Sequence, residues 1–365
     1  MKTYFPGLNT LRFYAALSVV LAHFVAPVTW FNDIESFNWR FRGIFMEGNT
    51  AVTLFFVLSG FLILGLLIRE KDTTGTVSVR RFYIRRVFRI LPLYYLTVIA
   101  GAIIVVLTWN VSNRDSHLEA SNPAIWLTLI FFVYNFMRSM ALPLTHLWSL
   151  NIEEQFYLFA PHAIRLVRTI PAALIGFVGL KFAAQAVCWF AYQATGRGIF
   201  SLMLTFSGQM RFEAMALGGL GAYLVYKQHP LLRYIFHPVT QIASAVGFIV
   251  IALSDVPSLF LADYAVAFVF MVFIVNTAAA PHCFYRVETP LLRRLGDLSY
   301  SIYMAHVPIF WLLYAGGARG IVYQTVGIAF TLGAAFLLHH SFEVPFMRLR
   351  ERFNPSLIPT PDVQT

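Results

Sequence analysis

Long apolar runs recur along this chain and constrain its fold more than any other feature. A helix needs roughly 20 residues to cross a hydrocarbon core of ~30 Å, and most of these runs have about that length. The pattern predicts an all-α membrane protein, a polytopic bundle of about ten transmembrane helices. The predicted spans are 8–29, 50–68, 90–109, one crossing within 124–164, 171–193, 205–226, 238–254, 258–278, 298–315 and 321–342.

The composition agrees with a membrane location. Of the 365 residues, 58% are hydrophobic and 12% are charged, whereas about 25% of the residues of a soluble protein are charged. The formal net charge of +10 comes from Lys and Arg residues that gather at the ends of the apolar runs, as the positive-inside rule describes. This distribution indicates membrane lipids as partners and argues against nucleic acid. The two cysteines, Cys188 and Cys283, fit neither a disulfide framework nor a metal site, so no metal is expected.

The basic segments predict the orientation of the chain. Residues 69–89 are rich in Lys and Arg, so this segment is predicted to be cytoplasmic, and the N-terminus with it. The first apolar run carries no cleavage site and is interpreted as a retained helix. Ten crossings place both termini in the cytoplasm. We expect one membrane domain, residues 1–350, and a short cytoplasmic C-terminal tail, residues 351–365.

The region 124–164 is the irregular part of this prediction. Its two apolar stretches, 124–137 and 156–164, are each too short for an ordinary span. One net crossing, with a half-buried or re-entrant part, leaves the later basic loops on the cytoplasmic side. Irregular backbone is tolerated at membrane depth only where it lines protein or water. Residues 140–157 are therefore a candidate wall of a cavity.

Ionisable residues inside transmembrane helices are costly and mark candidate functional sites. His23 lies deep in the first span, and Arg12 precedes it by eleven residues. Eleven helical steps bring the two side chains to within about 20° of one face, ~16 Å apart along the axis. A buried histidine is often only structural, but the aligned arginine favours a functional role.

Further polar residues lie in or beside other apolar runs. Glu153, Glu154 and Tyr157 predict a polar wall of a substrate cavity, although an interfacial turn with aromatic anchors explains them equally well. His306 is a second buried imidazole and is assigned to the same cavity. Glu343, at the end of the last span, faces either the interface or the cavity.

Three arginines near residue 90 offer donors for phosphate groups. Arg85 and Arg89 are spaced i,i+4, and Arg86 and Arg89 are spaced i,i+3, so they share a helix face. The plain interpretation is a topology signal that contacts lipid phosphates. Planar guanidinium groups also suit the phosphates of a nucleotide that arrives from the cytoplasm.

Six sequence blocks, taken in order, resemble the membrane-bound acyltransferase family 3, the O-acyltransferases of bacterial glycans. Each block is weak alone, but together they extend over nearly the whole chain. Two departures are Asn9, where the family often has Asp, and Asn49, where it usually has a second Gly. The matching blocks are 8–23, 54–62, 83–94, 148–157, 298–306 and 342–345.

The resemblance implies roles for residues of these blocks. It implies ten helices and a cytoplasmic entrance for acyl-CoA, most often acetyl-CoA, as the acyl donor. His23 is similar to the catalytic histidine, and Arg12 to its essential partner. Further positions in the blocks are assigned to donor binding, with Glu343 assigned to the catalytic set. The assigned donor-binding residues are Arg85, Arg86, Arg89, Trp148 and Tyr300.

These observations lead to a hypothesis of acyl transfer in a bacterial inner membrane. His23 as general base removes the proton of an acceptor hydroxyl while it attacks the thioester, since an imidazole has an ordinary pKa of about 6.5. Transfer through an acyl-imidazole is an alternative route. Arg12 positions the donor or stabilises the oxyanion. The acceptor is expected to be a glycan or a lipid-linked sugar, contacted through loops such as 30–49 and 110–123.

Two other functions are compatible with the sequence. A transporter or flippase without chemistry also buries His, Arg and Glu in a helical bundle. An acyltransferase that acts on a secondary metabolite, such as a macrolide, would share every motif named above.

Overall fold

The computed structural model is helical nearly throughout, which confirms the all-α class. It describes residues 4–23, 45–112, 114–136, 142–254 and 260–353, and these contain no strand. The part of the first predicted span beyond residue 23, most of the loop 30–49 and the tail from residue 354 lie outside the described residues. The last helix ends at Phe353, so it crosses the predicted boundary at residue 350.

Five helices of the described residues are long and apolar enough to cross a membrane, and a sixth span arises if one bent pair is counted. The multi-pass class is confirmed, and the number ten stays a prediction. The bent pair is α14 (Pro290–Asp297) with α15 (Ser299–Ala315), which meet at 61°. The five are α3 (Gly48–Thr74), α4 (Val79–Leu107), α8 (Ile170–Thr195), α13 (Phe260–Ala279) and the helix of residues 320–353 that begins with α16 (Gly320–Leu338).

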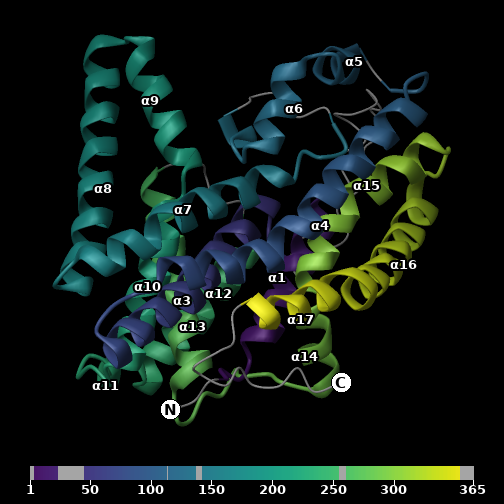
Figure 1. Cartoon of the computed structure of the whole chain (residues 1–365). Helices are drawn as coiled ribbons and strands as arrows, with labels where there is room; N and C mark the ends of the chain where they lie inside the picture. The colour runs from purple at the N-terminus through teal and green to yellow at the C-terminus, as the bar shows by residue number, and fades with distance from the viewer. Residues whose placement is uncertain (1–3, 24–44, 113, 137–141, 255–259, 354–365) are drawn as a thin grey trace. The chain divides into compact units, whose positions relative to one another are not determined.

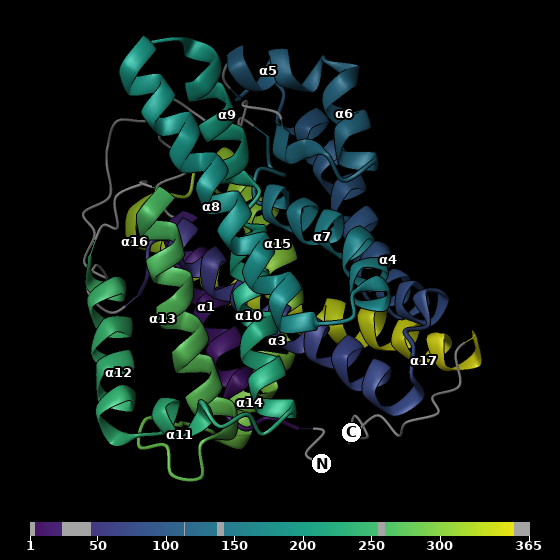
Figure 2. The same cartoon turned by 90° about the vertical axis from the view of Figure 1, so that its left-hand side faces the viewer.

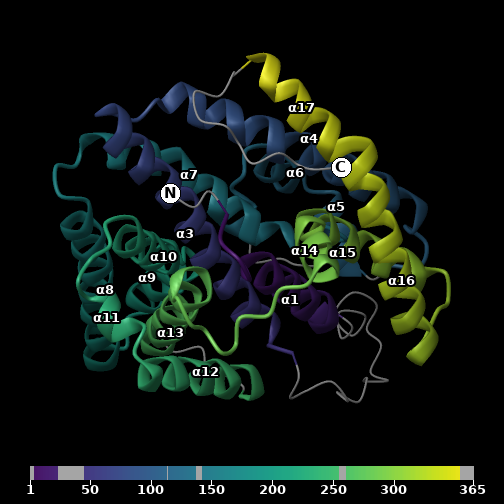
Figure 3. The same cartoon turned by 90° about the horizontal axis from the view of Figure 1, so that it is seen from below.

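The chain forms two compact units, which we describe separately. Unit 1 contains residues 1–48, 78–151 and 288–365, and unit 2 contains residues 49–77 and 152–287. Unit 1 is centred on α15, which packs against α16, α4 and α1 (Leu8–Ala22). α1 also packs against α14. After α16 the chain passes through one π-helical turn, His339–Glu343, into α17 (Val344–Phe353), which lies along α4 (Figure 3).

Helix α4 extends the predicted span 90–109 backwards through the basic segment. Ser78 caps the helix by accepting a hydrogen bond from the Arg81 backbone N–H, which satisfies one donor of the first turn. Its 29 residues are about 44 Å long at 1.5 Å per residue, more than a hydrocarbon core needs. Most of the predicted loop 69–89 is therefore helical. Arg69 lies at the end of α3, and the other arginines of this segment lie at the start of α4.

The region 124–164 is interrupted, as expected for an irregular segment. Its helices are α6 (Pro123–Ile130) and α7 (Leu147–Leu166), with a 3-10 turn at Tyr134–Phe136 between them. α6 begins after Asn122, whose side chain accepts from the Ala124 N–H. The short helix α5 (Arg114–Ala120) precedes α6. The path of this region through a bilayer stays a prediction.

In unit 2, α10 (Phe212–Tyr226) packs against α13 and α8. α8 and α9 (Gly198–Gln209) stand side by side (Figure 1), and α12 (Pro238–Leu253) runs beside α13 (Figure 2). The short helix α11 (Leu232–Ile235) precedes α12.

The prediction of a single helix over the span 205–226 is wrong, because the helix is interrupted between α9 and α10. Arg211 lies at the break, where its guanidinium donates to Thr53 and to the Asn49 carbonyl and lies 3.8 Å from the Asp263 carboxylate. A charged side chain with three polar neighbours is satisfied at this break, whereas in a continuous apolar helix it would be costly.

Two glycines let the backbones of α3 and α10 approach closely. A Cβ atom added at Gly60 would overlap the Met215 carbonyl oxygen, and one at Gly218 would overlap the Val57 carbonyl oxygen. Small residues permit such close packing between membrane helices. This contact joins segments that are about 150 residues apart in sequence and holds unit 2 together.

We predict that Gly60→Ala lowers the melting temperature of the purified protein by about 5 °C or more, because overpacking against a backbone costs about 1–3 kcal/mol or more. Gly179→Ala on α8 is the matched control. No atom lies within 4 Å of a Cβ added there, so its melting temperature should be unchanged or slightly higher. Equal melting temperatures for the two variants, measured in the same detergent, would contradict this packing.

Candidate functional site

His23 follows the last residue of α1, and a backbone carbonyl orients its ring. Its Nδ1 lies 2.8 Å from the Val19 carbonyl oxygen, one turn earlier. Because a carbonyl oxygen can only accept, Nδ1 carries the hydrogen, and Nε2 of the neutral ring is the nitrogen with the lone pair. Nε2 is therefore the atom that can accept a proton from a substrate.

His306 of α15, which the sequence assigned to the substrate cavity, lies against His23. The Nε2 of His306 is 3.4 Å from the Nδ1 of His23, and the ring centroids are 4.8 Å apart. The Nδ1 of His306 lies 2.6 Å from the Tyr303 carbonyl oxygen, so this nitrogen carries the hydrogen and Nε2 accepts. His306 is fully buried. Its Nε2 thus faces the N–H group of His23 with a lone pair.

This arrangement suits a histidine that gains a proton at Nε2. The resulting positive charge is shared with Nδ1–H, which points toward two acceptors, the Val19 carbonyl and the Nε2 of His306. Both acceptors fix the ring orientation before any reaction and stabilise the cation afterwards. This is the geometry that a preorganised general base requires.

A third imidazole, His146, completes the cluster, and the sequence analysis missed it. Its ring centroid is 4.9 Å from that of His306, and it is 1% exposed. Tyr303 donates its hydroxyl to the His146 carbonyl at 2.5 Å and contacts the Ser149 hydroxyl at 2.7 Å. Among the described residues, neither ring nitrogen of His146 has a partner in hydrogen-bond geometry. A buried polar group of this kind is available to a ligand or to water.

Glu343 lies in the π-helical turn and is held by two neighbours. Its carboxylate accepts from the Ser301 hydroxyl at 3.0 Å and lies 2.9 Å from the Nδ1 of His339. Glu343 is 4% exposed. Ser301 precedes His306 by five residues on α15, so the carboxylate supports the helix that carries the second imidazole.

Arg12 and His23 are not brought together by the structure. Arg12 is half-buried on α1, about 16 Å along the axis from His23 as eleven helical steps require. Trp148 is half-buried in the first turn of α7. Any common role for Arg12 and His23 depends on a ligand long enough to reach both.

The three arginines assigned to donor binding lie on the first turns of α4. Arg85, Arg86 and Arg89 are half-buried, and the Arg86 guanidinium lies 5.9 Å from the Phe82 ring centroid. Tyr300 of α15 donates its hydroxyl to the Ile90 carbonyl at 2.9 Å. Tyr300 therefore anchors α15 directly beside the arginines.

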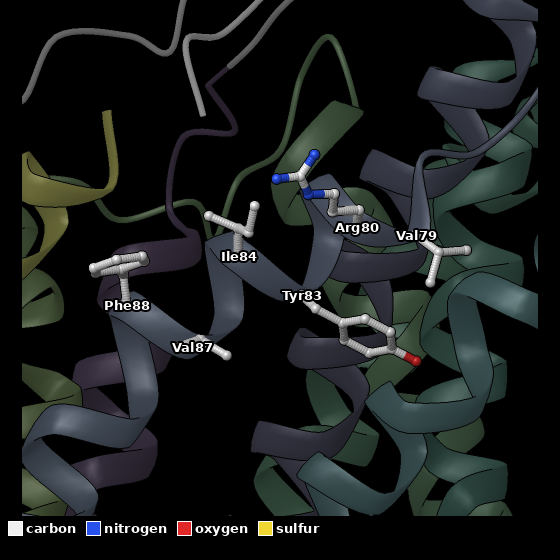
Figure 4. Close-up of a pocket in the computed structure, with 6 residues that line it drawn as sticks. All are labelled: Val79, Arg80, Tyr83, Ile84, Val87 and Phe88. Atoms are coloured by element: carbon white, nitrogen blue, oxygen red, sulfur yellow. The ribbon is translucent and has the colours of Figure 1, made fainter. Parts of the chain in front are cut away.

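A hollow of about 600 Å³ lies on another face of the same turns. Figure 4 shows its lining side chains, which are mainly apolar and include two aromatic rings. They are Val79, Arg80, Tyr83, Ile84, Val87 and Phe88.

Two other sequence-predicted residues meet in unit 2. Glu153 and Tyr157 form a hydrogen-bonded group with Ser59 of α3. Ser59 donates to Glu153 at 3.0 Å, Tyr157 donates to Glu153 at 3.1 Å, and the two hydroxyls are 2.8 Å apart. Glu154 is half-buried. The group satisfies a carboxylate inside an apolar environment.

The residues that the sequence analysis missed had detectable signals. His146 lies two residues before the block that begins at Trp148, and Ser59 lies inside an apolar block already recognised. His339 precedes Glu343 by four residues, the spacing of a helical pair. No group of three or more His, Cys, Asp or Glu among the described residues is arranged to hold a metal ion.

Comparisons with known proteins give the family context. The sequence model of one family, described as an acyltransferase domain, matches residues 5–340. The chain is 26% identical over 380 residues to "Putative O-acetyltransferase SACOL0978" of Staphylococcus aureus (strain COL), with 98% of this chain and 60% of that protein covered. It is 26% identical over 329 residues to "Putative peptidoglycan O-acetyltransferase YrhL" of Bacillus subtilis (strain 168), with 85% and 49% covered.

A further relative is "O-acetyltransferase OatA" of Staphylococcus aureus (strain NCTC 8325 / PS 47), 25% identical over 377 residues. The match covers 94% of this chain and 57% of that protein. The chain thus spans about half to three fifths of the length of the curated relatives it matches. No solved structure was found to match it.

Proposed function

The chain belongs to the acyltransferase-domain family, and from this premise we propose that it transfers an acyl group, most often acetyl, from acyl-CoA to a hydroxyl of a cell-surface or exported glycan. The observation that carries the proposal is the fixed imidazole of His23, whose Nδ1 lies 2.8 Å from the Val19 carbonyl. The names of two relatives, which refer to O-acetyl transfer and to peptidoglycan, support the reaction type and the acceptor class.

In the proposed reaction His23 acts as the general base. The Nε2 of His23 takes the proton of the acceptor hydroxyl while the hydroxyl oxygen attacks the thioester carbonyl carbon. The tetrahedral intermediate carries a negative charge on the former carbonyl oxygen. When it collapses, the carbon–sulfur bond breaks, the ester remains on the acceptor, and the thiolate takes the proton from His23. His306 keeps the His23 ring in place throughout, with Nε2 as an acceptor.

The donor is proposed to enter at the basic end of α4. Arg86 and Arg89 would bind the phosphates of acyl-CoA with charge-assisted hydrogen bonds, and Tyr300 connects this end of α4 to the helix that carries His306. The basic segment is proposed to face the cytoplasm of a bacterium, with both termini on the same side of the inner membrane. The acceptor would then meet the acyl group at the other end of the histidine cluster.

We predict that His23→Ala lowers acetyl transfer by about 100-fold or more, because it removes the general base. Arg89→Ala should raise the KM for acetyl-CoA with little change in kcat. The assay is alkali-labile radiolabel in the glycan fraction of inverted membrane vesicles supplied with labelled acetyl-CoA. His162→Ala, at an exposed histidine of α7, is the control and should keep wild-type transfer. Full activity of the His23 and Arg89 variants at normal expression would contradict the proposal.

His306 offers a separate test of the orienting role. His306→Phe removes the acceptor that faces the His23 N–H group, and we expect kcat to fall by about 10- to 100-fold with the KM for acetyl-CoA unchanged. His306→Gln can present an amide oxygen and should restore part of kcat. An equal decrease of kcat in the two variants, or a change in KM with kcat unaffected, would show that His306 does not orient the base.

A further inference from the structure

α17 is a second helix that carries arginines next to the basic end of α4. The two helices pack against each other (Figure 3). The Phe353 ring stacks on the Phe88 ring, with centroids 5.4 Å apart and planes at 19°. Phe353 and Arg350 are spaced i,i+3, so Arg350 shares the face of α17 that is directed at α4.

Arg350 lies within the electrostatic influence of two arginines of α4. The positive charges of Arg89 and Arg85 act on its half-buried guanidinium, as does the negative charge of Glu351, its exposed neighbour. Like charges that the packing holds close together repel one another, and a bound anion removes this repulsion. Arg350 is half-buried, while Arg348 and Arg352 on the other face are exposed.

The hollow on the neighbouring face of α4 is the second feature that indicates a ligand. It takes up about 600 Å³ and is lined by apolar side chains with the rings of Tyr83 and Phe88 (Figure 4). Phe88 is the residue that stacks on α17, so the hollow reaches the α4–α17 contact at this side chain. Aromatic rings suit a planar base, and guanidinium groups on the same turns of α4 suit the phosphates that such a base carries.

We propose that Arg350 joins Arg85 and Arg89 in a phosphate-binding site formed by two helices, and that this site holds the nucleotide end of the acyl donor. The assignment of the phosphates to acyl-CoA rests on the proposed function. Anionic phospholipid headgroups offer the same phosphate chemistry, and the experiment below separates the two sources. α17 is thereby part of the donor site and not only the end of the last span.

The test compares two donors with wild-type protein and Arg350→Ala in nanodiscs of phosphatidylcholine. Acetyl-CoA carries the nucleotide phosphates, whereas acetyl-pantetheine lacks them. We expect Arg350→Ala to raise the KM for acetyl-CoA by about 10-fold or more, with kcat and the KM for acetyl-pantetheine unchanged. The KM of Arg350→Lys for acetyl-CoA should lie between the values of wild type and Arg350→Ala. Arg348→Ala, on the exposed face of the same helix, should match wild type.

Direct binding keeps this inference separate from the proposed function. Unacylated CoA and adenosine 3′,5′-bisphosphate should raise the melting temperature of wild-type protein, as ligands of the folded state do, and this rise should be lost in Arg350→Ala. If that rise is lost while no acetyl transfer is detected in wild type, the site stands and the proposed function fails. If Arg89→Ala weakens CoA binding and Arg350→Ala does not, Arg350 lies outside the site and the proposed function stands.

The lipid alternative has its own outcome. If phosphatidylglycerol in the nanodiscs raises the melting temperature of wild type but not of Arg350→Ala, and CoA has equal effects on both proteins, the arginines bind lipid and our assignment is wrong. If neither CoA nor the bisphosphate shifts the melting temperature of wild type, the phosphate site is refuted together with the donor.

Discussion

An apolar helix gives a polar side chain few places to hydrogen-bond, and the candidate site follows from how its histidines meet that constraint. His23 and His306 each direct Nδ1 toward a carbonyl of their own helix, at Val19 and at Tyr303. Because those carbonyls can only accept, both rings have the same tautomer, and in each ring Nε2 holds the lone pair. One of these lone pairs faces the N–H of the other ring. The backbone of two helices thus determines which nitrogen of His23 is available for chemistry.

The other parts of unit 1 hold the two imidazoles in register. α15 is tied to α4 by the hydroxyl of Tyr300, to the π-helical turn by Ser301, and to the segment before α7 by Tyr303. These three residues lie within one turn of each other and just before His306. Groups that act in catalysis need neighbours that fix their positions. The hydroxyl-rich start of α15 fixes the position of His306 in this way.

The sequence predicted a large part of this arrangement, and the misses have physical reasons. Apolar runs of ~20 residues identified the spanning helices because crossing a bilayer fixes helix length. Both histidines could be identified as buried imidazoles, but not as a pair, since contacts between residues 283 positions apart depend on packing. The break at Arg211 was missed because its polar partners lie on other helices. His146 was missed because it stands outside any apolar run.

We propose that unit 1 carries both a phosphate site, on α4 and α17, and a fixed base at the end of α1. A structure of the protein with an acyl-CoA analogue, in which a methylene group replaces the thioester sulfur, tests this most directly. We expect phosphate groups within hydrogen-bond distance of Arg89 and Arg350. We expect the acyl carbonyl carbon within about 4 Å of the position of an acceptor oxygen bonded to the Nε2 of His23. An analogue bound with its acyl group far from His23, or with its phosphates away from α4, would show that this arrangement is wrong.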